Sequence, residues 1–184
     1  MTSDKSSLEP DHLSGDPLAF AALVRRYQGS LFAYLGRMGL SDALCEELAQ
    51  ETFLRVWKNR EKYDPTKAAL STWIFTIGRN VALDTLSRKT ASVADEKDID
   101  QCADFSHASD PSQQYEQHES IVRLRQALST LTMEDREVIA ACYTPEIENT
   151  QQILNCSEGA LRTRLSRARK RLSVALKRLD KLYE

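Results

Sequence analysis

The chain has 184 residues, 41% of them hydrophobic, with 25 Lys and Arg against 27 Asp and Glu. This length allows one domain or two small ones, and the six Gly and five Pro exclude collagen-like and low-complexity chains. No apolar run is long enough to cross a bilayer and the N-terminus is polar and acidic, so we expect no membrane insertion, no secretory signal and a cytoplasmic location.

The first predicted helix begins at Asp16, because aspartate suits a helix N-cap and Pro17 suits the first helical position. Apolar residues then recur every three or four positions as far as Met38, which is the period of an amphipathic helix. Gly39 is expected to end this helix. Residues 1–15 have no such period, and we expect them to form a flexible N-terminus.

Two more helices are predicted in the first half. Ser41 can cap a second helix, whose apolar residues run to Trp57. An Asp-Pro turn within residues 62–70 interrupts the pattern. Ser71 can cap a third helix, which is expected to run to about Arg88. Strand-like alternation is sustained nowhere, so the expected fold class is all-α.

Residues 90–115 are small, polar and acidic, with six Asp and Glu against one Lys. They have no amphipathic period, and their like charges repel one another. We therefore expect a flexible acidic linker here. It divides the chain into two small helical domains, at residues 16–89 and 116–184.

The second half shows a capping box, a break and a long final helix. Thr132 and Asp135 have the spacing of a capping box, and Pro145 ends the helix that they open. A short helix is expected near residues 149–155. Ser157 then caps a final helix, which keeps a leucine and alanine stripe to the end of the chain.

The final helix is strongly basic, with nine Lys and Arg against two Asp and Glu in residues 161–184. A short helix, a tight connection and a basic amphipathic helix are typical of a helix-turn-helix, whose second helix enters the DNA major groove. A solvated basic face, or a helix that binds an acidic protein, has the same pattern. If the helix binds DNA, the side chains expected to contact it are Arg162, Thr163, Ser166 and Arg167.

No motif of an active site is present. The chain has no Gly-rich phosphate loop, no nucleophile elbow and no zinc-protease motif. The cysteines have no metal-ligand spacing, and we expect reduced structural thiols at Cys45, Cys102, Cys142 and Cys156. We therefore expect no catalytic residue, no metal and no cofactor.

Two blocks of sequence resemble sigma-70-type transcription initiation factors, and are closest to the extracytoplasmic function (ECF) group. Residues 50–89 resemble sigma region 2, with the sequence QETFLRVWKNREKYDP followed by ALSTWIFTIGRNVALDTLSRK. Residues 131–140 and 156–172 resemble region 4, with the sequences LTMEDREVIA and CSEGALRTRLSRARKRL. The blocks occur in the family's order on either side of the linker.

The resemblance implies a promoter-specificity subunit that binds core RNA polymerase, recognises the −35 and −10 elements of promoter DNA and promotes DNA melting, without catalysing a reaction. It places polymerase binding on Glu46, Glu47, Gln50, Glu51 and Phe53. It places −10 recognition and melting on Lys62, Tyr63, Thr66, Lys67, Ser71, Trp73 and Asn80, with Trp73 in a supporting role. It places −35 recognition on the four side chains already singled out on the basic helix.

The sequence departs from the family pattern in three places. Leu44 stands where the docking helix usually has an acidic residue, which predicts binding to core polymerase that is either weaker or conditional on a modification. The segment of residues 144–155 is about two residues shorter than in the family pattern. We therefore expect the first helix of the helix-turn-helix to be shortened and the orientation of the basic helix to be altered. Pro10 and Gly15 interrupt the first short helix of region 2.

Other functions and several modes of control stay open at this stage. An autonomous helix-turn-helix repressor or activator would bind duplex DNA without polymerase, although no long dimerisation helix is present. A redox protein would use the cysteines. Control by an anti-sigma factor, by phosphorylation of Thr52 or Thr66, or by thiol oxidation fits the sequence equally well.

Overall fold

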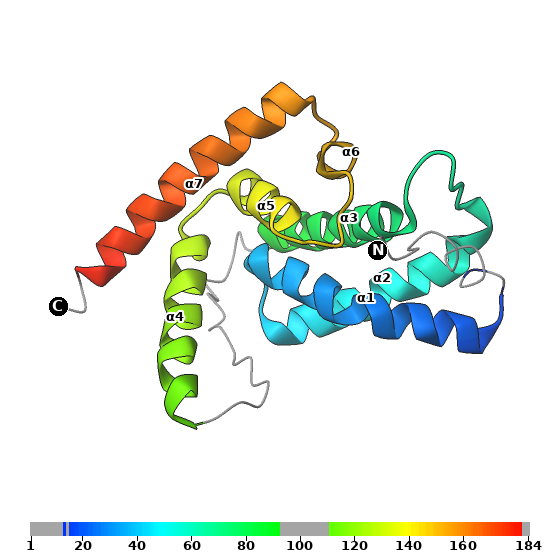
Figure 1. Cartoon of the computed structure of the whole chain (residues 1–184), viewed down its shortest axis with the longest axis horizontal. Coiled ribbons are helices and arrows are strands. Elements are labelled where there is room, and N and C mark those ends of the chain that lie inside the picture. The colour runs from blue at the N-terminus through cyan, green and yellow to red at the C-terminus, as the bar shows by residue number, and fades with distance from the viewer. Residues whose placement is uncertain (1–12, 14, 93–110, 182–184) are drawn as a thin grey trace, which may run out of the picture.

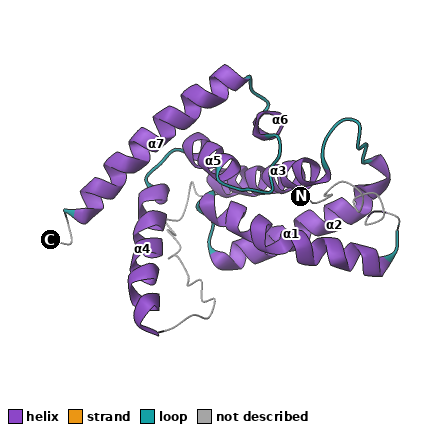
Figure 2. Cartoon of the chain, viewed as in Figure 1, coloured by secondary structure: helices purple, strands orange, loops and turns teal. Residues whose placement is uncertain are grey.

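The computed structural model describes residue 13 and residues 15–92 and 111–181, and all of its regular structure within those ranges is helical (Figures 1 and 2). The all-α prediction is therefore confirmed. The elements are α1 (Pro17–Arg37), α2 (Asp42–Asn59), the 3₁₀ turn η2 (Arg60–Lys62), α3 (Leu70–Ser92), α4 (Pro111–Ser129), α5 (Met133–Cys142), α6 (Thr150–Leu154) and α7 (Glu158–Asp180).

Hydrogen bonds at the helix N-termini explain where most of these helices start. The Asp16 carboxylate accepts bonds from the backbone N–H groups of Leu18, at 3.0 Å, and Ala19, at 3.4 Å. The Thr132 and Ser157 hydroxyls each accept one from the residue three positions on. The predictions at these three residues are confirmed. Such caps satisfy backbone donors that the first helical turn leaves unbonded.

The prediction that Ser71 caps the third helix is wrong. Helix α3 already begins at Leu70, so Ser71 lies inside its first turn. Its side chain is buried, and its hydroxyl has no hydrogen-bond partner among the residues that the structure describes. The helix also continues past Arg88 to Ser92. Helices thus enter both ends of the segment predicted as a linker, and residues 93–110 lie outside the described part of the chain.

Helices α1, α2 and α3 form a bundle with a closely packed core. Leu23, Val56 and Ile74 are fully buried, and the rings of Tyr34 and Phe75 meet edge to face with centroids 5.5 Å apart. Helices α1 and α3 approach so closely at Gly78 that an added Cβ would lie 2.8 Å from Leu31 Cδ1. An alanine at that crossing would therefore force the Leu31 side chain to shift.

The two halves of the chain pack against each other. Helix α5 contacts α1, α6 contacts α3, and α7 contacts α4 and α5 (Figure 1). The buried apolar cluster runs without interruption from α1, α2 and α3 into α5, α6 and α7. The sequence indicated two small helical domains joined by a linker, and it did not indicate this shared core.

Candidate functional site

A groove of about 1290 Å³ lies between α1 and α2. Its apolar lining includes Phe20 and Trp57, whose rings meet at 4.8 Å between centroids, and Leu54, which is 53% exposed. Charged and amide side chains also line it: Arg25, Arg26, Asp42, Glu46 and Gln50. An exposed apolar groove with polar side chains around it is typical of a surface that binds a helix of another protein.

The residues predicted to bind polymerase lie at or next to this groove. Glu46, Glu47 and Gln50 are exposed on α2, and the first and last of these line the groove. Glu51 is half-buried and forms an ion pair with Arg55 at 2.6 Å. Phe53 is only 7% exposed, so it supports the groove from the core and offers little surface to a partner.

The loop between η2 and α3 is held in shape by one aspartate. The Asp64 carboxylate accepts hydrogen bonds from the hydroxyl of Thr66 at 2.6 Å and from its backbone N–H at 3.0 Å. It also forms an ion pair with Lys67 at 3.3 Å. The Thr66 hydroxyl, followed by its N–H and by Lys67, lowers the pKa of Asp64. The loop is therefore ordered while Thr66 and Lys67 stay exposed.

Aromatic side chains pack beneath this loop. The Tyr63 hydroxyl donates to the carbonyl of Ala68 at 3.1 Å, and the rings of Tyr63 and Trp73 lie 5.1 Å apart. Both are half-buried, so they brace the loop. Asn80 is exposed on α3 and Lys62 on η2, whereas Ser71 is buried and has no surface with which to contact DNA.

Helices α6 and α7 form the helix-turn-helix, and α6 has only five residues. Asn149 caps α6, and Asn155 ends it in the left-handed conformation with φ +46°. Asparagine tolerates this conformation better than most residues. The short α6 agrees with the reduced helix expected from the sequence.

The four side chains predicted to read DNA are all exposed on the N-terminal half of α7: Arg162, Thr163, Ser166 and Arg167. Among the described residues, the ion-pair partner of Arg162 is exposed Glu158, at 2.7 Å on the same helix. Arg171, farther along α7, donates to both carboxylate oxygens of buried Asp135, at 2.6 and 2.8 Å. The domain thus anchors the middle of α7 and leaves its first turns available.

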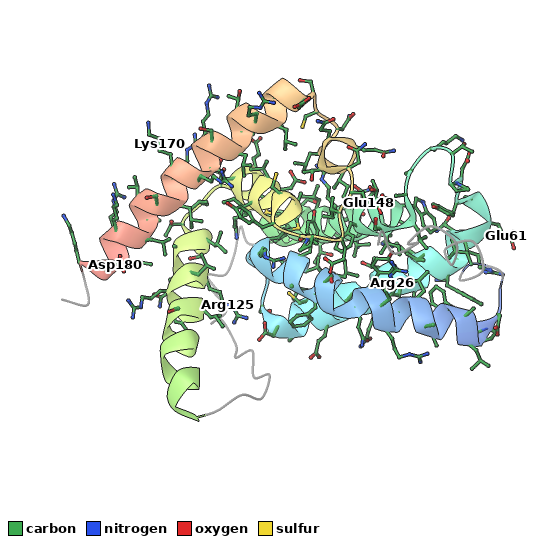
Figure 3. All side chains as sticks on the ribbon, viewed as in Figure 1. Arg26, Glu61, Arg125, Glu148, Lys170 and Asp180 are labelled. Carbon is green, nitrogen blue, oxygen red and sulfur yellow. The ribbon has the colours of Figure 1, made fainter. Side chains whose placement is uncertain are left out.

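A second groove, of about 720 Å³, was not foreseen from the sequence. It lies between the turn that joins α4 to α5 and the C-terminal half of α7, with Leu131, Val174 and Leu179 in its lining. Lys170 and Arg178 also line it, and Lys170 projects outward from α7 (Figure 3). The only sequence signal was Val174, an apolar residue on a basic helix and 48% exposed.

The remaining candidate residues are the cysteines and the two proposed phosphorylation sites. Burial raises the pKa of the Cys45 thiol to about 12, which makes it unreactive. Cys102 lies outside the described residues. Thr52 is fully buried and donates to the Leu48 carbonyl at 2.6 Å, so the prediction that it is a phosphorylation site is wrong. A kinase can reach exposed Thr66.

Within the described ranges no cluster of metal-ligating residues occurs, and no helix could span a membrane.

Comparison with known proteins gives consistent matches. The family model for sigma-70 region 2 matches residues 23–92. The ECF RNA polymerase sigma factor SigL of Mycobacterium tuberculosis is 30% identical over 175 residues, which cover 91% of this chain and 96% of SigL. RpoE of Cereibacter sphaeroides, also an ECF sigma factor, is 28% identical over 166 residues, covering 89% of this chain and 86% of RpoE.

Solved structures share the fold. The sigma factor RpoE from Bartonella quintana, in complex with the anti-sigma factor NepR, superposes with a TM-score of 0.70 at 23% identity. That match covers 86% of this chain and 96% of RpoE. CnrH, in complex with the cytosolic domain of CnrY, gives a TM-score of 0.65 at 23% identity, covering 92% and 95% of the two chains.

Proposed function

Because the chain belongs to the ECF group of sigma-70-type RNA polymerase sigma factors, and so acts in transcription initiation, we propose specific roles for its surfaces. In this proposal the α1–α2 groove binds core polymerase. The loop before α3 and Asn80 act on the −10 element, and α7 reads the −35 element. The protein catalyses no reaction itself and works in the bacterial cytoplasm, where polymerase transcribes the chromosome. Residues 16–89 act as region 2 and residues 116–184 as region 4.

The α1–α2 groove is the observation that carries the proposal. It combines the exposed apolar side chain of Leu54 with the carboxylate of Glu46 and the amide of Gln50. Such a surface suits an amphipathic helix with basic residues at the edges of its apolar face. A helical segment of the largest polymerase subunit, its clamp coiled coil, is the partner that we assign to it.

The loop before α3 suits an unpaired −10 base. Exposed Lys62 and Lys67 can neutralise backbone phosphates, and the Asn80 amide can read a base edge. Melting requires a base to leave the stack and enter a protein site, and an ordered loop lowers the entropy cost of that capture. Asp64 and the Tyr63–Trp73 contact supply the order.

The exposed first turns of α7 suit the major groove at the −35 element. Arg162 can give two hydrogen bonds to guanine, and Thr163 and Ser166 can reach bases or phosphates. The groove beside Val174 lies farther along the same helix, where we place contact with the polymerase flap. An anti-sigma factor is a further proposed partner, by analogy with the complexes of RpoE and CnrH.

The experiment that tests the docking assignment is co-purification with core polymerase. Glu47→Lys combined with Gln50→Ala should abolish co-purification while the circular dichroism spectrum keeps its helical signal, because both side chains are exposed on α2. Glu61→Lys is the matched control: it makes the same charge change at an exposed residue outside the groove. Retained polymerase binding in the folded double variant would remove the assignment.

A further inference from the structure

An exposed tyrosine and an exposed arginine are joined where α5 ends beside α7. Tyr143 is 47% exposed, and Arg169 is exposed on α7. Arg169 Nε donates to the Tyr143 hydroxyl at 2.8 Å, and the guanidinium carbon lies 5.3 Å from the centre of the tyrosine ring. A hydrogen bond and a cation–π contact thus hold this surface arginine in place, although holding such a long side chain still costs conformational entropy.

Tyr143 is itself fixed by the backbone on either side of it. Its N–H donates to the Ile139 carbonyl at 3.0 Å, where α5 ends. The next residue, Thr144, is buried, and its hydroxyl donates to the Ala140 carbonyl at 2.7 Å. The tyrosine ring therefore projects from an anchored point of the domain, which lets it hold Arg169 in one orientation.

This contact leaves the positive charge of Arg169 available. Arg171, two residues farther along α7, pairs with the Asp135 carboxylate at 2.6 Å. In the described part of the chain Arg169 forms no such ion pair, and its partner is a neutral hydroxyl, which orients the guanidinium without cancelling its charge. Burial raises the pKa of the Cys142 thiol, and the charge of Arg169 opposes that rise. The positive charge thus lies at the end of α5.

The hydrogen-bond donors of this pair suit a phosphate. A guanidinium has several N–H donors, and only the one on Nε is used by Tyr143. The N–H groups of Nη1 and Nη2 have no hydrogen-bond partner among the described residues. The Tyr143 hydroxyl accepts the bond from Nε, so its own hydrogen is also available to an acceptor. Arginine binds phosphate oxygens through two parallel N–H bonds, and the tyrosine O–H adds a third donor beside them.

Arg169 lies on the side of α7 that carries Arg162. It follows Arg162 by seven residues, which places the two side chains about 20° apart around the helix and about 10 Å apart along it. The DNA major groove is about 12 Å wide. When Arg162 reaches a base edge on the floor of the groove, Arg169 therefore lies at the wall of the groove, where the phosphates are.

We propose that the Tyr143–Arg169 pair is a preformed binding site for one backbone phosphate of the −35 element. Arg169 supplies the charge and two N–H donors. Tyr143 is a positioning residue for Arg169 and donates its hydroxyl hydrogen to the same phosphate. The proposal rests on the proposed function, since it takes α7 as the helix that enters the major groove. Because phosphate contacts fix orientation and carry no sequence information, the pair orients α7 while other side chains select the bases.

Holoenzyme binding to two DNA duplexes tests this proposal. The first is a promoter fragment that the wild-type holoenzyme selects from a library of −35 sequences, and the second is the same fragment cut just downstream of the −35 element. On the first, Arg169→Ala should lower the slope of log affinity against log salt by about 1. On the second it should bind as wild type does. Lys177→Ala is the matched control, because it removes one charge from an exposed position farther along α7 and should keep the wild-type slope.

A double variant separates positioning of Arg169 from a general structural role of Tyr143. Tyr143→Phe keeps the ring and removes the hydroxyl, so it should weaken binding to the first fragment by about 2- to 12-fold, the value of one hydrogen bond. In a chain that also carries Arg169→Ala it should cause no further loss, because without the guanidinium no phosphate is held beside the hydroxyl. An effect that persists in the double variant would overturn the proposal.

Two other results would overturn the phosphate site alone. One is a wild-type salt slope in the Arg169→Ala holoenzyme while its −35 preference is intact. The other is equal weakening on both fragments, or loss of co-purification with core polymerase, which would show that the pair binds polymerase. A wild-type holoenzyme that binds both fragments equally would instead refute −35 recognition by α7, and the phosphate site with it. The failure of the site and the failure of the proposed function are therefore distinguishable.

Discussion

Arg162 offers the sharpest test of base reading by α7. In the described part of the chain it forms an ion pair with Glu158, and the two side chains are 80% and 69% exposed. Exposed pairs one helical turn apart contribute about 0.3–0.5 kcal/mol to stability. Arg162→Ala should therefore change the free energy of unfolding by no more than about 0.5 kcal/mol. A bidentate contact to guanine is worth about 1–3 kcal/mol, or about 5- to 150-fold in affinity.

The assay is binding of the reconstituted holoenzyme to a library of −35 sequences at several salt concentrations. Holoenzyme that carries Arg162→Ala should no longer bind the preferred base more tightly than the other bases at one −35 position. At the other positions it should keep the wild-type order of preference. Arg171→Ala is the comparison on the same helix: it leaves buried Asp135 without its guanidinium, which costs about 1–3 kcal/mol of stability. That variant should weaken binding to all sequences alike.

Equal weakening of every −35 sequence by Arg162→Ala would refute base reading. Helix α7 would then bind DNA by charge alone, and removal of one phosphate contact should lower the slope of log affinity against log salt by about 1. Sequence selection would in that case depend on the −10 element, and the five-residue α6 would be the structural cause of the misdirected helix.

Four further results are expected. Asn80→Ala should reduce open-complex formation and change base preference at one −10 position, and unchanged preference throughout would show that Asn80 does not read a base. Gly78→Ala should cost about 1–3 kcal/mol in urea unfolding, since the added methyl overlaps Leu31; wild-type stability would contradict that. Iodoacetamide at pH 8 should leave Cys45 unmodified in the native chain, since its pKa is about 12. Stability should fall as the pH rises from about 9 toward 12, because the thiol ionises first in the unfolded state.

The helix boundaries that depend on local hydrogen bonds were predictable. Asp16, Thr132 and Ser157 each bond to backbone N–H groups two or three residues away, so the residues that decide those starts are adjacent in the sequence. Exposed candidates such as Arg162 were also predictable, because a polar side chain outside the apolar stripe of a helix faces solvent unless another element covers it.

The features that the sequence did not predict depend on contacts between distant segments of the chain. Helix α3 has no single apolar stripe, because it packs on α1 and α2 and also on α6. Ser71 is buried in that setting, and a capping pattern gives no sign of it. Because Glu137 is charged, it would be expected on the surface. It is instead buried against Arg79, which lies 58 residues earlier in the chain. The groove beside Val174 likewise exists only once α7 packs against α5.

The burial of α3 on several sides has an evolutionary consequence. Between Leu70 and Arg88, its exposed positions are Asn80, Asp84, Ser87 and Arg88, which follow one another at helical spacing along a narrow stripe. Substitutions at the buried positions of the helix disturb packing on α1, α2 or α6, so we expect sequences to diverge more freely along this stripe. Under the proposed −10 assignment, relatives that prefer different −10 sequences should therefore differ chiefly at these four positions and in the loop before them.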